Sequence, residues 1–284
     1  MEGLAAKDPV TAWGLLDQLG PGATHTEATA RVLEVWAGKD PSTAMEAAKG
    51  LSGEDRETLE RFARKLAMAD SNLAARWCNG QEAENVGEIR AAVIEGAFAT
   101  ANADNVRPKA DALMAVLKDQ RDARESSAAG IAREMSLVDG TAALAWAGSL
   151  DGTARATAME AVIGQLAGVV PLDAAKALQN ELAGENQIPP SVVRDVAAAM
   201  SMQDTEAACA WANQLPANHR AEATRAIISA WAREDAASAS AWLSRQPDSE
   251  AKVAAAAVLA AEIAALDADA ATAWQEFARR KSND

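Results

Sequence analysis

The sequence is short of the residue types that most often carry chemistry. Tyrosine is absent from its 284 residues, aromatic residues make up only 4%, and histidine and cysteine occur twice each. This scarcity argues against a site built from paired histidines or from a cysteine–histidine dyad. A Walker loop and a GxGxxG motif are also missing. We therefore expect no catalytic residue, no bound metal and no cofactor.

Long apolar runs and a basic stripe are missing as well. No stretch approaches the roughly 18 apolar residues that span a membrane, and the first residues lack the basic start and apolar core of a signal peptide. The sequence thus predicts a chain that is soluble as given and does not insert into a membrane, and it leaves the compartment open. With 27 basic and 41 acidic residues, the net charge is −14. Because nucleic-acid binding needs a basic surface, we expect no nucleic-acid partner.

What the sequence does have is alanine arranged in a repeating motif, D-x3-A-x2-[WL]. Alanine has the highest helix propensity, so this composition indicates an all-α protein. The motif recurs nine times at intervals of 30 to 36 residues, close to 32. Its first position falls at Asp8, Asp40, Asp70, Val106, Asp139, Pro171, Asp204, Asp235 and Asp267. Its alanine position is filled every time, by Ala12, Ala44, Ala74, Ala110, Ala143, Ala175, Ala208, Ala239 and Ala271.

Each motif has the features of a helix start. Aspartate is a favoured N-cap, and proline, which follows it at Pro9 and Pro41, is favoured at the first helical position. A second amphipathic helix fills the rest of the period. The pattern predicts a single α-solenoid over residues 1–284, of about eight and a half antiparallel helical hairpins in a superhelix of either hand. The abrupt start and the unpaired half-repeat at the end would suit a fragment of a longer protein.

This motif resembles a class of tandem helical-hairpin repeats with a DPxxAxxW-type consensus, found in bacterial proteins and largely without assigned function. It is also broadly similar to the tetratricopeptide (TPR) and HEAT superhelices, although the period is shorter than that of the tetratricopeptide repeat and the usual Gly and Tyr positions are missing. The resemblance covers residues 4–280. It implies a scaffold that presents a long groove to another protein.

The motif explains most conspicuous residues as structural. The seven aspartates are expected to be helix caps rather than metal ligands, because calcium needs several oxygens converging from one compact loop. The tryptophans that recur in one slot are expected in the core: Trp77, Trp146, Trp211, Trp242 and Trp274. Cys78 and Cys209 lie in the third and seventh repeats, too far apart for a disulfide.

Departures from the repeat are where recognition is most expected, although sequence drift is the favoured explanation of them. The longest interval contains the polar, loop-like segment 101–109, and a second polar turn precedes Pro189 and Pro190. The candidate partner-binding residues in these two segments are Asn102, Asp104, Arg107, Lys109, Glu185 and Asn186.

Three functions remain open from the sequence. The first is a non-catalytic scaffold that binds a protein or peptide of unknown identity in the groove of a helical superhelix. The second is an enzyme resembling an α/α toroid, with an acidic active site at its mouth. The third is DNA binding on helical repeats, which requires a basic concave face. The oligomeric state is left open.

Overall fold

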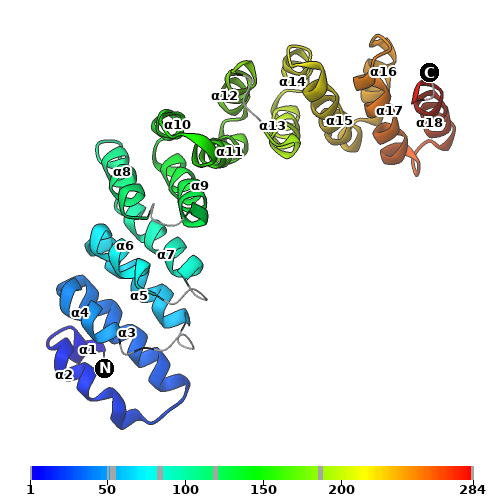
Figure 1. The fold of residues 1–284 in the computed structure, drawn as a ribbon. Helices are drawn as coiled ribbons and strands as arrows, with labels where there is room; N and C mark the ends of the chain where they lie inside the picture. The colour runs from blue at the N-terminus through cyan, green and yellow to red at the C-terminus, as the bar shows by residue number, and fades with distance from the viewer. Residues whose placement is uncertain are drawn as a thin grey trace. The chain divides into compact units, whose positions relative to one another are not determined.

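The chain folds into helices in the computed structural model, which describes residues 2–49, 51, 56–81, 86–117, 121–184 and 188–282. These residues form eighteen α-helices and one 3-10 helix, η1, and contain no strand (Figure 1). The all-α fold class is therefore confirmed. The helices are α1 Glu2–Ala5, α2 Pro9–Gly14, η1 Leu16–Leu19, α3 Ala23–Lys39, α4 Pro41–Ala48, α5 Arg56–Ala69, α6 Ser71–Asn79, α7 Val86–Phe98, α8 Val106–Leu117, α9 Arg121–Val138, α10 Gly140–Ser149, α11 Gly152–Val169, α12 Pro171–Ala183, α13 Pro190–Gln203, α14 Thr205–Ala212, α15 Ala217–Glu234, α16 Ala236–Arg245, α17 Glu250–Ile263 and α18 Ala268–Ser282.

The motif aspartates lie at the starts of helices. In all seven, a carboxylate oxygen accepts a hydrogen bond from the backbone N–H three residues later, over 2.9 to 3.2 Å. These bonds satisfy an amide that the first helical turn leaves free. For Asp8, the hydroxyl and the amide of Thr11 together hold the pKa of the carboxyl below its usual value.

The sixth motif differs from its expected geometry. Pro171 is the first residue of α12 rather than its cap, and Val170 takes the cap position without a side-chain hydrogen bond. Proline suits this place because its fixed φ matches the helix and it has no N–H to leave unpaired.

Contacts divide the chain into two compact units, Met1–Met159 and Glu160–Asp284. In an elongated repeat array each hairpin touches only its neighbours, so a division by contacts also arises within one continuous array. The single domain expected over residues 1–284 stays a prediction.

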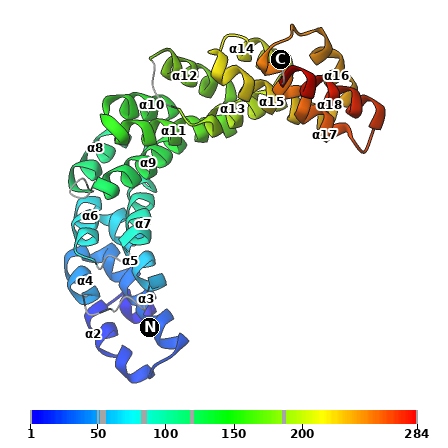
Figure 2. The same ribbon diagram turned by 45° about the vertical axis from the view of Figure 1, so that its right-hand side comes forward.

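The first unit has two layers of helices. We call the helix that follows each motif helix the second helix. The second helices α3, α5, α7 and α9 pack in chain order, each on the next, and the shorter motif helices α4, α6, α8 and α10 do the same beside them (Figure 2). The second unit repeats the order of second helices, with α13 packed on α15 and α15 on α17, and the motif helix α18 packs on α17.

The core follows the motif closely. All nine motif alanines are buried, and their small side chains permit close helix contact. Trp77, Trp146 and Trp211 are buried as well. Trp242 and Trp274 are only partly buried and pack against the core of the second unit. The expectation that they lie inside the core is therefore met only in part.

Two indole groups also join neighbouring motif helices. The indole N–H of Trp146 on α10 donates to Asp111 Oδ1 on α8 at 3.0 Å. The indole N–H of Trp274 on α18 donates to Ser240 Oγ on α16 at 2.9 Å. Trp146 and Trp274 therefore each fix one motif helix against the previous one, whereas the buried indole N–H groups of Trp77 and Trp211 have no hydrogen-bond partner among the described residues.

Candidate functional site

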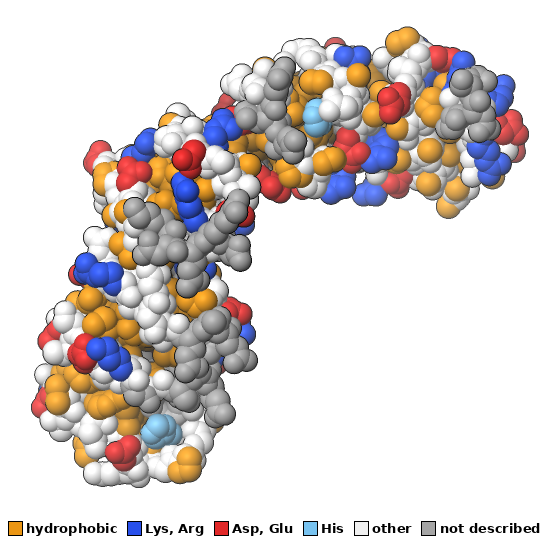
Figure 3. All heavy atoms as spheres, viewed as in Figure 1, with side chains coloured by type: hydrophobic (Ala, Val, Ile, Leu, Met, Phe, Trp, Pro, Cys, Tyr) orange, Lys and Arg blue, Asp and Glu red, His pale blue; other side chains and the backbone are white. Residues whose placement is uncertain are grey.

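Ion pairs connect successive second helices. In the first unit, Arg61 of α5 reaches two carboxylates of α3, Glu34 at 2.9 Å and Glu27 at 2.7 Å. These two hydrogen-bonded carboxylates, Glu34 before Glu27, raise the pKa of Arg61 above its ordinary value. Arg64 of α5 pairs with Glu95 of α7 at 2.9 Å. On the face of the molecule in Figure 3, basic and acidic side chains are accordingly interspersed.

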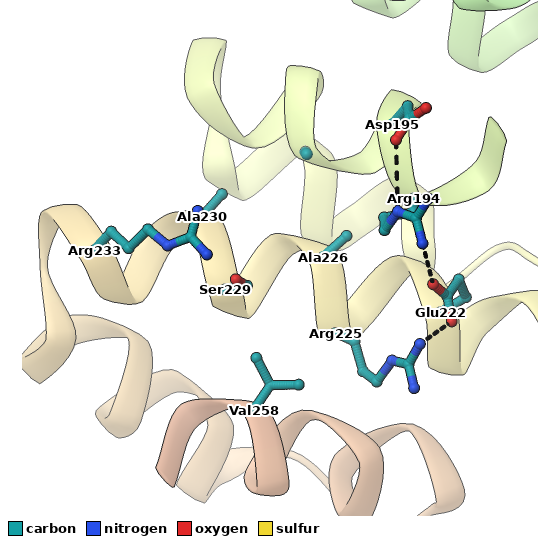
Figure 4. A pocket seen from close by; sticks show the side chains of 10 residues that line it. Arg194, Asp195, Glu222, Arg225, Ala226, Ser229, Ala230, Arg233 and Val258 are labelled. Atoms are coloured by element: carbon teal, nitrogen blue, oxygen red, sulfur yellow. Dashed lines mark hydrogen bonds and ion pairs between the residues drawn. The ribbon is translucent and has the colours of Figure 1, made fainter. Parts of the chain in front are cut away.

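The second unit has a pocket on the surface formed by its second helices. It has a volume of about 380 Å³ and is lined by three successive second helices, α13, α15 and α17 (Figure 4). Its apolar part consists of Ala198 from α13, Ala226 and Ala230 from α15, and Val258 from α17. We call this set the floor.

Three arginines surround the floor, and we call them the rim. Arg194 comes from α13, and Arg225 and Arg233 come from α15. Between two of them lies Glu222, which pairs with Arg225 and, at 3.9 Å, with Arg194 (Figure 4). Arg194 also approaches Asp195 at 3.5 Å. We refer to rim and floor together as the arginine-rimmed pocket.

The third rim arginine is held by a carboxylate of α17. Arg233 donates to Glu262 through Nε at 3.1 Å and Nη2 at 2.8 Å, and the hydroxyl of Ser229 donates to the same carboxylate at 2.6 Å. These bonds, that of Arg233 first, hold the pKa of Glu262 below its usual value. The glutamate therefore stays charged and anchors the guanidinium at the pocket mouth.

The chemistry available in this pocket is recognition. Guanidinium groups present planar pairs of N–H donors that match carboxylates, and the floor accepts apolar atoms. Ser229, a hydroxyl among the lining residues, has Glu262 as its hydrogen-bond acceptor, and neither His25 nor His219 lines the pocket. The lining residues therefore lack the nucleophile and base pair that acyl transfer requires.

The structure places the predicted partner-binding residues elsewhere. Asn102, Asp104, Arg107 and Lys109 belong to the first unit, whereas the arginine-rimmed pocket belongs to the second. Glu185 and Asn186 lie outside the described residues.

The segment 101–109 is also less of a loop than its composition indicates. Helix α8 begins at Val106, so the expectation of a loop through position 109 is wrong. The side-chain oxygen of Asn102 accepts from the backbone N–H groups of Asp104 and Asn105, at 3.0 and 3.2 Å. The polar residues of this segment thus organise the turn before α8, while Asp104 is exposed.

The two basic residues of this segment have partners within the chain. Lys109 Nζ donates to the carbonyl of Ala97 at 2.7 Å and to the hydroxyl of Thr100 at 3.0 Å, which closes the end of α7. Arg107 Nη2 donates to Ser149 Oγ at 3.2 Å. A structural role accounts for both side chains.

An acidic pair lies on the second helices of the first unit. Burial, followed by repulsion from Glu95, raises the pKa of Glu134 on α9, and Arg133 opposes the shift. Glu95 itself is paired with Arg64. The ionised form of Glu134 is therefore less favourable in the folded chain than in the unfolded chain.

We expect glutamine in place of Glu134 to raise the Tm at neutral pH, because the unfavourable charge is removed. The raised pKa means that the folded wild type takes up a proton before the unfolded chain does as the pH falls. The difference in Tm between variant and wild type should therefore shrink as the pH falls through that raised pKa toward the ordinary glutamate value. Thermal unfolding followed by circular dichroism over this pH range measures it.

Glu57→Gln is the matched control, because Glu57 is exposed on α5 of the same unit. This substitution should leave the Tm unchanged or slightly lower at neutral pH. Equal Tm values for wild type and the Glu134 variant at neutral pH would contradict the expected repulsion.

In the part of the chain that the structure describes, the remaining reactive side chains form no second site. Cys78 and Cys209 are free and buried, and burial raises their pKa values to about 11 and about 12. No group of three or more His, Cys, Asp or Glu side chains suitable for a metal ion occurs among the described residues. Within the described ranges, none of the helices is both long and apolar enough to pass through a membrane.

A signal for the pocket does exist in the sequence, but it is weak. Arg194 lies ten residues before Asp204, and Arg225 lies ten residues before Asp235, so both occupy the same slot of successive repeats. Arg31 and Arg61 occupy a nearly equivalent slot, nine residues before Asp40 and Asp70. In the first unit these arginines meet Glu27 and Glu34, so the slot alone does not distinguish a structural ion pair from a rim.

No family model, no curated protein and no solved structure matches the chain. The inference of function therefore rests on the geometry described above.

Proposed function

We propose that the chain is a non-catalytic scaffold that binds a peptide or a segment of another protein. In this proposal the helical hairpins form an α-solenoid of about eight and a half repeats, and the second helices line its groove. The chain-order packing of α3 to α9 and of α13 to α17 supports this arrangement, as does the capping aspartate that starts seven of the motif helices. The resemblance to DPxxAxxW-type tandem repeats points to the same function.

The arginine-rimmed pocket is the observation that carries the proposal. It spans three successive second helices, which is where a ligand lying along the groove of a solenoid would make contact. It combines a small apolar floor with charged groups at its edge, the arrangement typical of specific binding sites. A peptide fits this surface better than a nucleic acid does, because the net charge is −14 and the basic groups of the pocket are interleaved with carboxylates.

A random-peptide display library tests the proposal directly. The library is selected in parallel on the wild-type chain, on the double variant Arg194→Gln/Arg225→Gln, and on Arg245→Gln. Arg245 is exposed at the end of α16, outside the pocket, and gives the same change of charge in the same unit. We expect related peptides to be enriched on the wild type and on Arg245→Gln but not on the double variant.

Two results would contradict the proposal. One is the absence of any peptide enriched above background on the wild type. The other is the same enriched set on the double variant, which would move the binding surface away from the pocket. Turnover of a substrate by the purified chain would favour the enzymatic alternative instead.

A further inference from the structure

We infer that the arginine-rimmed pocket takes an acidic peptide segment in which a small aliphatic side chain lies between two carboxylates. This inference rests on the proposed function and specifies the chemistry of its ligand. It follows from how charge, free hydrogen-bond donors and apolar surface are distributed across the pocket.

The positive groups of the pocket face solvent, two of its carboxylates lie beneath them, and the third, Asp195 beside Arg194, is 65% exposed. The side chains of Arg194, Arg225 and Arg233 are 54%, 44% and 68% exposed, whereas those of Glu222 and Glu262 are 15% and 23% exposed. A ligand arriving from solvent at Arg225 and Arg233 therefore meets guanidinium groups first. The half-buried glutamates hold the arginines in place without covering them.

The rim arginines also keep donors available for a ligand. A guanidinium has five N–H donors. Arg233 uses Nε and Nη2 on Glu262, and Arg225 uses Nη2 on Glu222. The Nη1 groups of these two arginines have no hydrogen-bond partner among the residues that the structure describes. Each can donate to a ligand carboxylate while its existing ion pair persists, and charge-assisted hydrogen bonds of this kind are the strong ones.

The spacing of the rim sets the spacing of the ligand carboxylates. Arg225 and Arg233 are eight residues apart on α15, which corresponds to about 12 Å along the helix axis. An extended peptide rises about 3.4 Å per residue, so two acidic residues separated by three others span roughly this distance. The floor residues Ala226 and Ala230 lie between the two arginines in the sequence, so the middle residue of the peptide falls over the floor.

The floor decides between an acidic peptide and other anions. Ala198, Ala226, Ala230 and Val258 offer apolar surface without a hydrogen-bonding side chain, which favours an aliphatic side chain. A phosphodiester backbone carries no such group, and the net charge of −14 repels an extended polyanion. An acidic segment with one aliphatic residue satisfies both the rim and the floor.

Fluorescence anisotropy with defined peptides tests this inference. The probe is fluorescein-labelled Glu-Ser-Leu-Ser-Glu-amide, titrated with the full chain. The comparison peptides are Gln-Ser-Leu-Ser-Gln, which lacks the charges, and Glu-Ser-Ser-Ser-Glu, which lacks the aliphatic side chain. We expect the probe to bind about tenfold more tightly than either comparison peptide, a difference that one good interaction supplies. Raising the salt concentration from about 50 mM to about 300 mM should weaken binding of the probe and leave binding of the uncharged peptide unchanged.

Variants of the rim give the second arm of the test. Arg225→Gln should lower the affinity for the probe about tenfold, and Arg245→Gln should leave this affinity unchanged. Because Arg225→Gln removes a partner of the half-buried Glu222, the double variant Arg225→Gln/Glu222→Gln removes both charges of the pair. Measuring its Tm and circular dichroism spectrum establishes whether it folds, and its affinity for the probe should fall to the same extent.

The outcomes separate this inference from the proposed function. If the library selects peptides that depend on Arg194 and Arg225 but carry no acidic residues, the scaffold proposal stands and the acidic-ligand inference is wrong. Equal affinity for the probe and the uncharged peptide also overturns it. Sedimentation equilibrium showing a dimer of the wild type that Arg225→Gln dissociates would assign the pocket to a second copy of the chain, again overturning it.

Discussion

Alanine in place of Gly96 is expected to destabilise the first unit by about 3 kcal/mol, at the upper end of the usual cost of overpacking a core. Gly96 is buried on α7, where this helix crosses α5. A Cβ atom at this position would lie 2.2 Å from the carbonyl oxygen of Arg64 and 2.9 Å from its Cα. Both atoms belong to the backbone, so the two helices must move apart. The higher helix propensity of alanine recovers only about 1 kcal/mol of this cost.

Urea unfolding followed by circular dichroism measures the effect, and Gly164→Ala is the matched control. Gly164 lies in the exposed interior of α11, with nothing within 4 Å of an added Cβ. There the same substitution should stabilise by up to about 1 kcal/mol through helix propensity alone. If both variants prove as stable as the wild type, α5 and α7 do not approach as closely as described.

Methionine in place of Lys252 is expected to destabilise the second unit by about 3 kcal/mol, the upper value for hydrogen bonds to a charged group. Lys252 is buried at the start of α17, and its Nζ donates to the carbonyls of Gln246 and Ser244 at 2.7 and 3.2 Å and to Asp248 Oδ1 at 3.3 Å. The same ammonium lies 5.1 Å from the ring centroid of Phe277 on α18. Lys252 thus closes the turn between α16 and α17 and contacts the next helix.

Methionine keeps most of the apolar stem of Lys252 and removes only its charge and its N–H donors. The loss of stability therefore measures the contribution of the hydrogen bonds. Lys176→Met is the control, because Lys176 is 64% exposed and pairs with Asp173 at 3.2 Å on the surface of α12. Exposed pairs of this kind contribute about 0–1 kcal/mol. Thermal unfolding that responds equally to both substitutions would contradict the role given to Lys252.

The sequence was sufficient to predict the parts of the fold that depend on local chemistry. An aspartate that caps a helix and an alanine that allows close contact act within one helix or between neighbours, so the motif marks Asp139 and Ala143 without any structure. The same pattern misjudged Trp274, which is only partly buried. Helix α18 is the last helix of the described residues, so no later described helix packs against this indole.

The candidate site could not be predicted because its residues come from three helices. Arg194, Glu222 and Val258 are each about one repeat apart in the sequence, and only the packing of α13, α15 and α17 brings them to one pocket. Polar composition pointed instead to residues 101–109. There Lys109 and Asn102 serve the turn before α8, a use of polar side chains that composition does not distinguish from recognition.

Hydrogen–deuterium exchange with the tightest peptide from the library tests the central claim, that ligands bind to the second helices at the arginine-rimmed pocket. The account predicts slower exchange, on peptide binding, in α13, α15 and α17 and unchanged exchange in residues 101–109. Slower exchange at residues 101–109 with none in α13, α15 or α17 would contradict it and return recognition to the segment that the sequence first indicated.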